Sequence, residues 1–215
     1  MTIIGTEELK SLFVRIAEAM AREKDRLCEL DGVIGDADHG IAMELGFAAA
    51  AKAVSELESS TSNPTLVFNT AAKSFLNAVG ASSGPLYATA LMRAGAVAKG
   101  KASLSDDDMV EIFAAFAKGI QDRGKAEVGE KTMVDAWAPA AAACRAAMDR
   151  GLSLADCLAA ALEAGEAGAE ATKDMVAAKG RSSRLGDRAL GHMDPGAASA
   201  VVVMVCFHDH FMRYR

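Results

Sequence analysis

The chain has 215 residues, a hydrophobic content of 51% and a net charge of −6, as expected for a globular protein with one substantial core. The acidic balance argues against a nucleic-acid or anionic-membrane surface, because either would need a concentrated basic face. No apolar stretch reaches the length of a membrane span, and we expect a single cytoplasmic domain over residues 1–215. Four scattered cysteines without CxxC spacing favour free thiols over disulfides or zinc.

Apolar residues recur at helical spacing along the chain, and no alternation with a period of two predicts a strand. The pattern predicts eight helices that begin at caps or prolines and end at polar or glycine-rich joins. Their expected ranges are about 6–30, 41–57, 64–79, 85–100, 106–123, 132–148, 154–179 and from 195 onward. Because the joins are short, we predict an all-α fold, an antiparallel up-down barrel or bundle of eight helices.

In an up-down array the odd-numbered connections all fall at one end of the molecule. The even connections of this chain are ordinary polar joins. The odd ones carry clustered aspartates, a Gly-Ser turn, a Gly-Lys loop and an arginine-rich segment, at 31–40, 80–84, 124–131 and 180–194. We therefore expect the chemistry of this protein at one rim of the barrel.

The first of these segments, DGVIGDADHG, is too glycine-rich to continue a helix and places three carboxylates within eight residues. Asp31, Asp36 and Asp38 would repel one another unless a cation lies among them, and Mg²⁺ prefers one or two carboxylates together with phosphate oxygens. The alternative is a solvated turn in which Asp38 caps the next helix. An EF-hand is excluded, because its sixth position counted from Asp36 is Ile41 instead of glycine.

The other rim segments suit a phosphorylated ligand. Ser82 and Ser83 precede a helix start, where hydroxyls and backbone N–H groups receive phosphate oxygens, although a plain capping turn would look the same. Arg181 opens a segment with three arginines, the residue type that neutralises a transferring phosphoryl group, although solvated surface arginines are the alternative. Met133 suits an adenine pocket or the core.

Four motifs occur together and in order: GDADHG at 35–40, GASSGPLYAT at 80–89, GEKTMVDAWAPA at 129–140 and GRSSRLGDRALGHMDPGAAS at 180–199. In this combination the chain resembles the ADP-binding subunit, or L subunit, of dihydroxyacetone kinases over essentially its whole length. The resemblance implies an eight-helix barrel whose rim holds ATP or ADP through two Mg²⁺ ions. It also explains the lack of a Walker A sequence.

The resemblance further implies roles for individual residues. Asp31, Asp36 and Asp38 would bind the metal ions and act in catalysis together with Arg181. The implied phosphate and nucleotide contacts are His39, Gly40, Ile41, Ala42, Ser82, Ser83, Gly124, Met133, Arg181, Asp194, Pro195 and Gly196. Two positions depart from the family pattern: Ala37 replaces the third glycine of the metal turn, and Glu130 replaces a more common aspartate.

In that family a separate K subunit holds the ketose covalently through a histidine, and the L subunit delivers the terminal phosphoryl group of its nucleotide. The resemblance thus implies a phosphotransferase that is half of an enzyme, acting on dihydroxyacetone or a four-carbon ketose such as erythrulose. Two alternatives stay open: an interaction module that keeps its ADP and is recharged by a phosphocarrier protein, and a magnesium-dependent hydrolase. The sequence also leaves a homodimer open.

Overall fold

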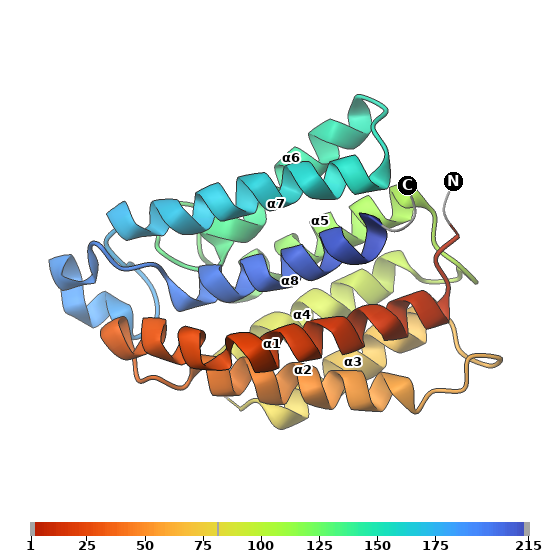
Figure 1. Ribbon diagram of the computed structural model, residues 1–215, viewed down its shortest axis with the longest axis horizontal. Coiled ribbons are helices and arrows are strands. Elements are labelled where there is room, and N and C mark those ends of the chain that lie inside the picture. Colours follow the sequence, from red (N-terminus) through yellow and green to blue (C-terminus); the bar gives the residue numbers. More distant parts are fainter. Residues whose placement is uncertain (1–2, 81, 213–215) are drawn as a thin grey trace.

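The computed structural model describes residues 3–80 and 82–212 of the chain. Within these residues eight α-helices run alternately up and down, and each packs on the next until α8 returns to α1 and closes the ring (Figure 1). Their bounds are α1 Thr6–Ile34, α2 His39–Ser55, α3 Pro64–Ala78, α4 Ser83–Val97, α5 Asp106–Gly124, α6 Val134–Asp149, α7 Leu154–Ala171 and α8 Pro195–Phe211. Besides one isolated bridge between Ile4 and Leu104, the described residues form no β-structure. The predicted all-α, eight-helix antiparallel barrel is confirmed.

Several helices begin where the sequence predicts, because the predicted caps are formed. The side chain of Asn63 accepts a hydrogen bond from Leu66 N ahead of Pro64. Ser153 and Asp194 cap α7 and α8 in the same way. Each cap satisfies one of the free N–H groups that every helix start leaves.

Several predicted helix boundaries differ from the structure, and three of them bear on the site. Helix α1 continues past Leu30 to Ile34, so Asp31 lies in its last turn and not in the connecting loop. Helix α4 begins at Ser83, before Pro85. Helix α7 ends at Ala171, where the prediction continues to Lys179. In the first case a single glycine, Gly32, costs the helix only about 1 kcal/mol, which packing against α2 outweighs.

Helix α7 ends early because of one side chain. The Thr172 hydroxyl donates to the carbonyl of Ala169 at 2.6 Å and accepts a hydrogen bond from Asp194 N at 2.9 Å. Two short 3-10 segments follow, η1 Thr172–Asp174 and η2 Ser182–Ala189, and lead back to α8. A contact with a residue far along the chain thus replaces the last helical turns that the sequence predicts.

Aromatic rings pack in series through the interior of the barrel. Phe47 contacts Phe75 and Tyr87 with ring centroids 5.0 and 5.3 Å apart, and Phe116 lies 5.9 Å from Tyr87 and 4.7 Å from Trp137. Three of these four pairs are edge-to-face, an arrangement that aromatic quadrupoles favour. Within the described part of the chain, none of the helices is both long and apolar enough to cross a bilayer.

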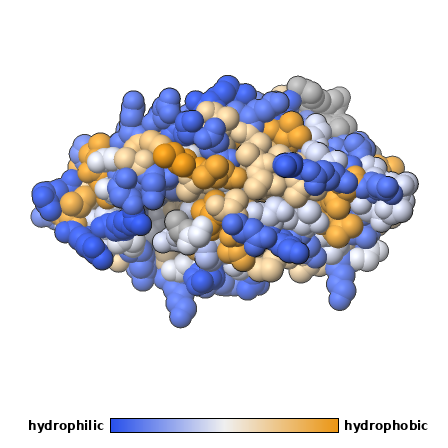
Figure 2. All heavy atoms as spheres, turned by 90° about the horizontal axis from the view of Figure 1, so that it is seen from below, coloured by the Kyte–Doolittle hydropathy of each residue, from blue (hydrophilic) through white to orange (hydrophobic). Residues whose placement is uncertain are grey.

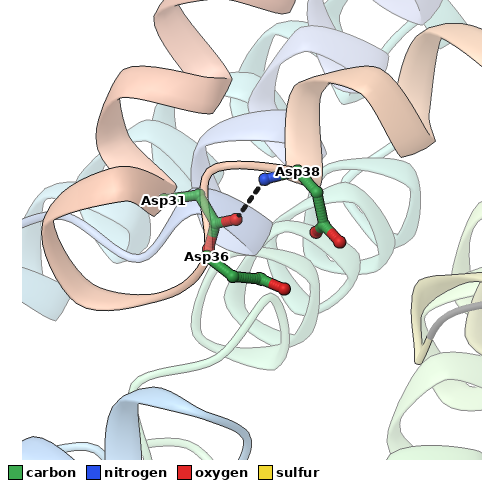
Figure 3. Close-up of side chains that lie close together, drawn as sticks. All are labelled: Asp31, Asp36 and Asp38. Carbon is green, nitrogen blue, oxygen red and sulfur yellow. Dashed lines mark hydrogen bonds between the residues drawn. The ribbon is translucent and has the colours of Figure 1, made fainter.

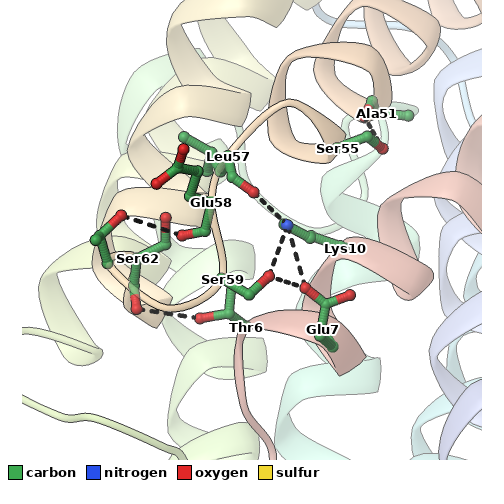
Figure 4. A network of polar contacts seen from close by, with 10 residues as sticks. Thr6, Glu7, Lys10, Ala51, Ser55, Leu57, Glu58, Ser59 and Ser62 are labelled. Atoms are coloured by element: carbon green, nitrogen blue, oxygen red, sulfur yellow. Dashed lines mark hydrogen bonds and ion pairs between the residues drawn. The ribbon is translucent and has the colours of Figure 1, made fainter.

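The end of the barrel away from the predicted rim is closed by a buried lysine (Figure 4). Lys10 on α1 donates to the carbonyl of Leu57, to the Ser59 hydroxyl at 2.8 Å and to Glu7 Oε1 at 3.1 Å. These bonds fasten the α2–α3 connection to the start of α1. The contacts at this end are therefore structural, in agreement with the plain composition of the even-numbered joins.

Candidate functional site

A cavity of about 480 Å³ opens at the rim where the odd-numbered connections meet. Asp31 reaches it from the end of α1, Ser83 from the start of α4, Gly124 from the end of α5 and Gly196 from the start of α8. The predicted site residues that line it are Asp31, Asp36, Asp38, His39, Ser82, Ser83, Gly124, Met133, Arg181, Asp194, Pro195 and Gly196. The fold thus brings most of the predicted site residues to one place.

Three predicted contacts, Gly40, Ile41 and Ala42, are not among the described residues that line this cavity. They form the first turn of α2. A Cβ atom on Gly40 would lie 2.0 Å from the carbonyl oxygen of Lys24, so glycine lets α1 and α2 approach closely here. Ile41 is exposed and Ala42 packs against the core.

The three aspartates converge as a metal site requires (Figure 3). One carboxylate oxygen from each of Asp31, Asp36 and Asp38 lies within 4.8 Å of the other two. Asp31 is buried, whereas Asp36 and Asp38 are exposed to the cavity side of the turn. Oxygen donors at this spacing are the kind that hard divalent cations prefer.

Asp31 also organises the turn that carries the other two aspartates. Its Oδ2 accepts hydrogen bonds from Asp38 N at 2.9 Å and from His39 N at 3.1 Å, both at the start of α2. Asp38 occupies the capping position, but its own side chain makes no capping bond. Asp31 therefore does the capping that the sequence analysis considered for Asp38.

Two small residues shape the same turn. A Cβ atom on Gly35 would lie 2.1 Å from Asp31 Oδ1, so a larger residue would displace the carboxylate. Ala37, the departure from the family pattern, adopts a left-handed backbone with φ +63°. Such a conformation costs an L-residue about 1 kcal/mol, so the turn holds its shape against local strain.

Arg181 extends over the aspartates from the α7–α8 connection. Its Nη1 atom contacts the carboxylate of Asp36 and lies 3.9 Å from Asp38 Oδ2. In the described part of the chain, Arg184 and Arg188 are not in the cavity lining. The guanidinium therefore offsets part of the negative charge that the aspartates bring together.

His39 is held in one orientation by the barrel interior. Its Nε2 lies 2.9 Å from the hydroxyl of Ser199, which donates its single hydrogen to the carbonyl of Gly196 at 2.9 Å. The donor in the His39–Ser199 hydrogen bond depends on which ring nitrogen carries the proton. Burial lowers the pKa of His39 more than the neighbouring Asp31 raises it, which favours the neutral ring.

Asp194 lies at the floor of the cavity and is buried. Its Oδ2 accepts a hydrogen bond from Ala197 N at 2.8 Å and so caps α8. Burial raises the pKa of Asp194 to about 7, although that hydrogen bond and the charge of Lys131 act in the opposite direction. This carboxyl therefore changes its charge near neutral pH.

Sequence reasoning missed a buried polar cluster made of Lys131, which lines the cavity, Asp135 and Thr172. Asp135 accepts hydrogen bonds from Gly129 N at 2.5 Å and Thr132 N at 2.7 Å. The spacing from Thr132 to Asp135 resembles a capping box, and this local signal could have revealed the aspartate. No comparable local pattern exists for Lys131, whose partners lie far along the chain.

Comparison with known proteins agrees with this geometry. The family model described as the DAK2 domain matches residues 33–209. The ADP-binding subunit DhaL of the PEP-dependent dihydroxyacetone kinase of Escherichia coli K12 is 36% identical over 202 residues, which cover 94% of this chain and 95% of that protein. The L-erythrulose 1-kinase of Mycolicibacterium smegmatis is 30% identical over 97% of this chain and 37% of its own length.

Among solved structures, the crystal structure of the dihydroxyacetone kinase from C. freundii in complex with AMP-PNP and Mg²⁺ superposes with a TM-score of 0.72. The match covers 94% of this chain and 33% of that one at 24% identity, which supports a shared fold. Since a family model spans most of the chain and a relative matches over nearly its entire length, the chain belongs to the DAK2 domain family and is a homologue of the ADP-binding subunits of dihydroxyacetone kinases.

Proposed function

We propose that this chain is the nucleotide-binding, phosphoryl-transferring subunit of a cytoplasmic kinase for dihydroxyacetone or a related small ketose. The observation that carries the proposal is that three aspartates and Arg181 line one cavity of about 480 Å³, which is within the usual size range of ligand pockets. The ADP-binding relatives support the same ligand class.

The aspartates fit the metal that such a function requires. Asp31, Asp36 and Asp38 each supply an oxygen within 4.8 Å of the others, and we assign to them two Mg²⁺ ions. The bound ions supply charge neutralisation on the phosphate oxygens. The chain's own part is to hold the three carboxylates together, which Asp31 does by anchoring the backbone of Asp38 and His39.

The remaining lining residues suit the nucleotide. Ser82 and Ser83 lie at the start of α4 and Gly196 at the start of α8, where free N–H groups and the helix dipole favour phosphate. We further propose that Gly40, Ile41 and Ala42 contribute as the N-terminal turn of α2. The base would lie against apolar lining residues such as Met133, with Gly124 leaving room beside it.

Arg181 would stabilise the transferring group directly. Its side chain is 60% exposed and, among the described residues, forms ion pairs with Asp36 and Asp38 alone, so it is able to exchange the carboxylate of Asp36 for phosphate oxygens. A guanidinium in that position offsets the charge that develops during transfer, which is the main task of a protein that catalyses phosphoryl transfer.

The ketose would arrive on a K-type partner subunit. Large apolar side chains are exposed on α1 and α2, the two helices that the aspartate turn joins: Val33 is 53% exposed, Ile41 48% and Leu45 52%. Figure 2 shows apolar groups among the charged ones on the side of the barrel that α2 and α3 form. Apolar side chains next to a reactive site suit a protein partner that must bring its substrate to the phosphate.

Calorimetric titration with Mg-ADP and Mg-ATP tests the proposal. We expect Asp36→Ala to abolish detectable nucleotide binding while the helical circular dichroism stays unchanged. Asp25→Ala, which removes an exposed aspartate of α1 away from the cavity, is the matched control and should bind as the parent does. Equal nucleotide affinity of Asp36→Ala and the parent would overturn the proposal.

A second candidate is a subunit that keeps its ADP and is recharged by a phosphocarrier protein. The name of the Escherichia coli relative, a PEP-dependent kinase subunit, favours it. ADP that stays bound through purification and accepts a phosphoryl group from a phosphoprotein would support this form. Rapid exchange of ADP for ATP during turnover with a K-type subunit, assayed with three- and four-carbon ketoses, would support the ATP-using kinase.

A further inference from the structure

Lys131 is a buried lysine in the connection between α5 and α6. Its side chain is only 1% exposed, and its backbone is left-handed with φ +58°. Burying an ammonium group is costly unless hydrogen bonds and opposite charges compensate. A strained, fully buried lysine beside a ligand cavity therefore calls for a specific role.

The contacts of Lys131 join two points of one segment. Its Nζ donates to the carbonyl of Thr172 and to the carbonyl of His192, both at 2.5 Å. Thr172 begins the α7–α8 connection and His192 lies near its end. One ammonium group therefore joins the two ends, here called the base, of the segment that carries Arg181. A hydrogen bond from Gly191 N to the carbonyl of Lys173 at 2.8 Å closes the same base.

The turn that presents Lys131 is itself fastened on both sides. Asp135 holds the amides of Gly129 and Thr132, which flank the lysine. The carbonyl of Glu130 accepts a hydrogen bond from Ala178 N at 3.1 Å, so the α5–α6 connection also contacts the Arg181 segment directly. The two connections that form this side of the cavity are therefore one hydrogen-bonded unit.

Lys131 is better placed to organise the site than to touch a phosphate. Although Lys131 belongs to the cavity lining, two of its three N–H groups are used by carbonyls and the residue is only 1% exposed. Burial lowers the pKa of Lys131, while Asp194 and Asp135 oppose that effect. Carboxylates of the protein thus balance the positive charge of Lys131.

We propose that Lys131 is a positioning residue: by closing the base of segment 172–192 it holds Arg181 over the aspartates and keeps the Asp194–Gly196 turn at the cavity floor. Its effect on the ligand rests on the proposed nucleotide function. Its effect on the segment does not, because the contacts of Lys131 are with backbone carbonyls of the segment itself.

The test compares Lys131→Met with Lys125→Met. Lys125 lies in the same connection with a similar backbone, φ +50°, but its side chain is exposed, so it is a matched control. We expect Lys131→Met to bind Mg-ADP at least about tenfold more weakly by calorimetry, as expected when a lost contact misplaces a binding group. In nucleotide-free protein, hydrogen exchange at the amides of Ala178 and Gly191 should accelerate in Lys131→Met alone, with helix content unchanged.

A second variant covers the case in which methionine is not tolerated in the buried site. Lys131→Gly accepts the left-handed backbone and removes the butylamine part of the side chain, so added butylamine should restore both slow exchange and Mg-ADP affinity. Slow exchange and parental affinity in Lys131→Met would overturn the inference, as would a lack of rescue in Lys131→Gly. If the parent itself binds no Mg-nucleotide, the proposed function fails and the exchange measurement still decides the role of Lys131.

Discussion

Arg181 Nη1 contacts the carboxylate of Asp36, although the two residues belong to connections at opposite ends of the chain. The positive charge of the guanidinium lies close to the clustered carboxylates and reduces their mutual repulsion. A divalent cation at the proposed metal site would therefore compete with Arg181 for the same oxygens, and a phosphorylated ligand would offer the arginine another partner. In this proposal, metal binding at the aspartates would release Arg181 to contact the phosphorylated ligand.

The first prediction concerns Arg181→Ala. Mg²⁺ should bind the nucleotide-free protein at least as tightly as it binds the parent, because the competing guanidinium is gone. Phosphoryl transfer with a K-type subunit should fall by about 10² to 10³, the usual cost of removing one group that stabilises the transition state. Metal titration and steady-state kinetics measure the two effects. Arg184→Ala, in the same segment but outside the cavity lining, should change neither.

The second prediction concerns the left-handed residue of the metal turn. Ala37→Gly should raise the free energy of unfolding by about 1 kcal/mol, because glycine adopts φ +63° without the penalty that alanine meets. Ala48→Gly, at an exposed position inside α2, should instead lower it by about 1 kcal/mol. Urea denaturation monitored by circular dichroism separates the two. Destabilisation of similar size in both variants would show that the turn is not strained.

The third prediction tests the close approach of α1 and α2. Gly40→Ala would place a methyl group 2.0 Å from the Lys24 carbonyl oxygen, so the helices must separate. We expect a loss of about 1–3 kcal/mol in unfolding free energy, typical of overpacking, together with weaker Mg²⁺ binding because Asp38 and His39 shift with α2. Gly80→Ala, whose added carbon meets no described atom within 4 Å outside its chain neighbours, is the control and should be nearly neutral.

The fourth prediction concerns pH. The pKa of Asp194 is about 7 in the folded protein, above that of an unfolded aspartate, so the folded state binds the extra proton over the interval between them. The contribution of this group to stability is present below the unfolded pKa and is lost as the pH rises to about 7. Asp194→Asn keeps a capping side chain but cannot ionise. As the pH rises from about 4 to about 7, the parent should therefore lose unfolding free energy relative to Asp194→Asn. A constant difference across that interval would show that Asp194 ionises normally.

Local patterns in the sequence sufficed for much of the architecture. Apolar periodicity and caps such as Asn63 and Ser153 depend on neighbours a few residues away, so eight helices and their order are readable from the chain. Alternation of direction then assigns the aspartates and Arg181 to the same rim, and the structure places them around one cavity.

Other features were decided only by tertiary contacts. Helix α7 ends at Ala171 because Thr172 bonds to Asp194, and Asp31 lies inside α1 while capping α2. The sequence could not predict a positioning role for Lys131. Its two acceptors are backbone carbonyls of distant residues, and every residue has such a carbonyl whatever its side chain. What the sequence by itself determined is the helices and the residues that carry charge, because both follow from side-chain type and short-range spacing. Which of those charges meet, and which are buried, was decided by packing, because backbone partners across the barrel leave no mark on the local sequence.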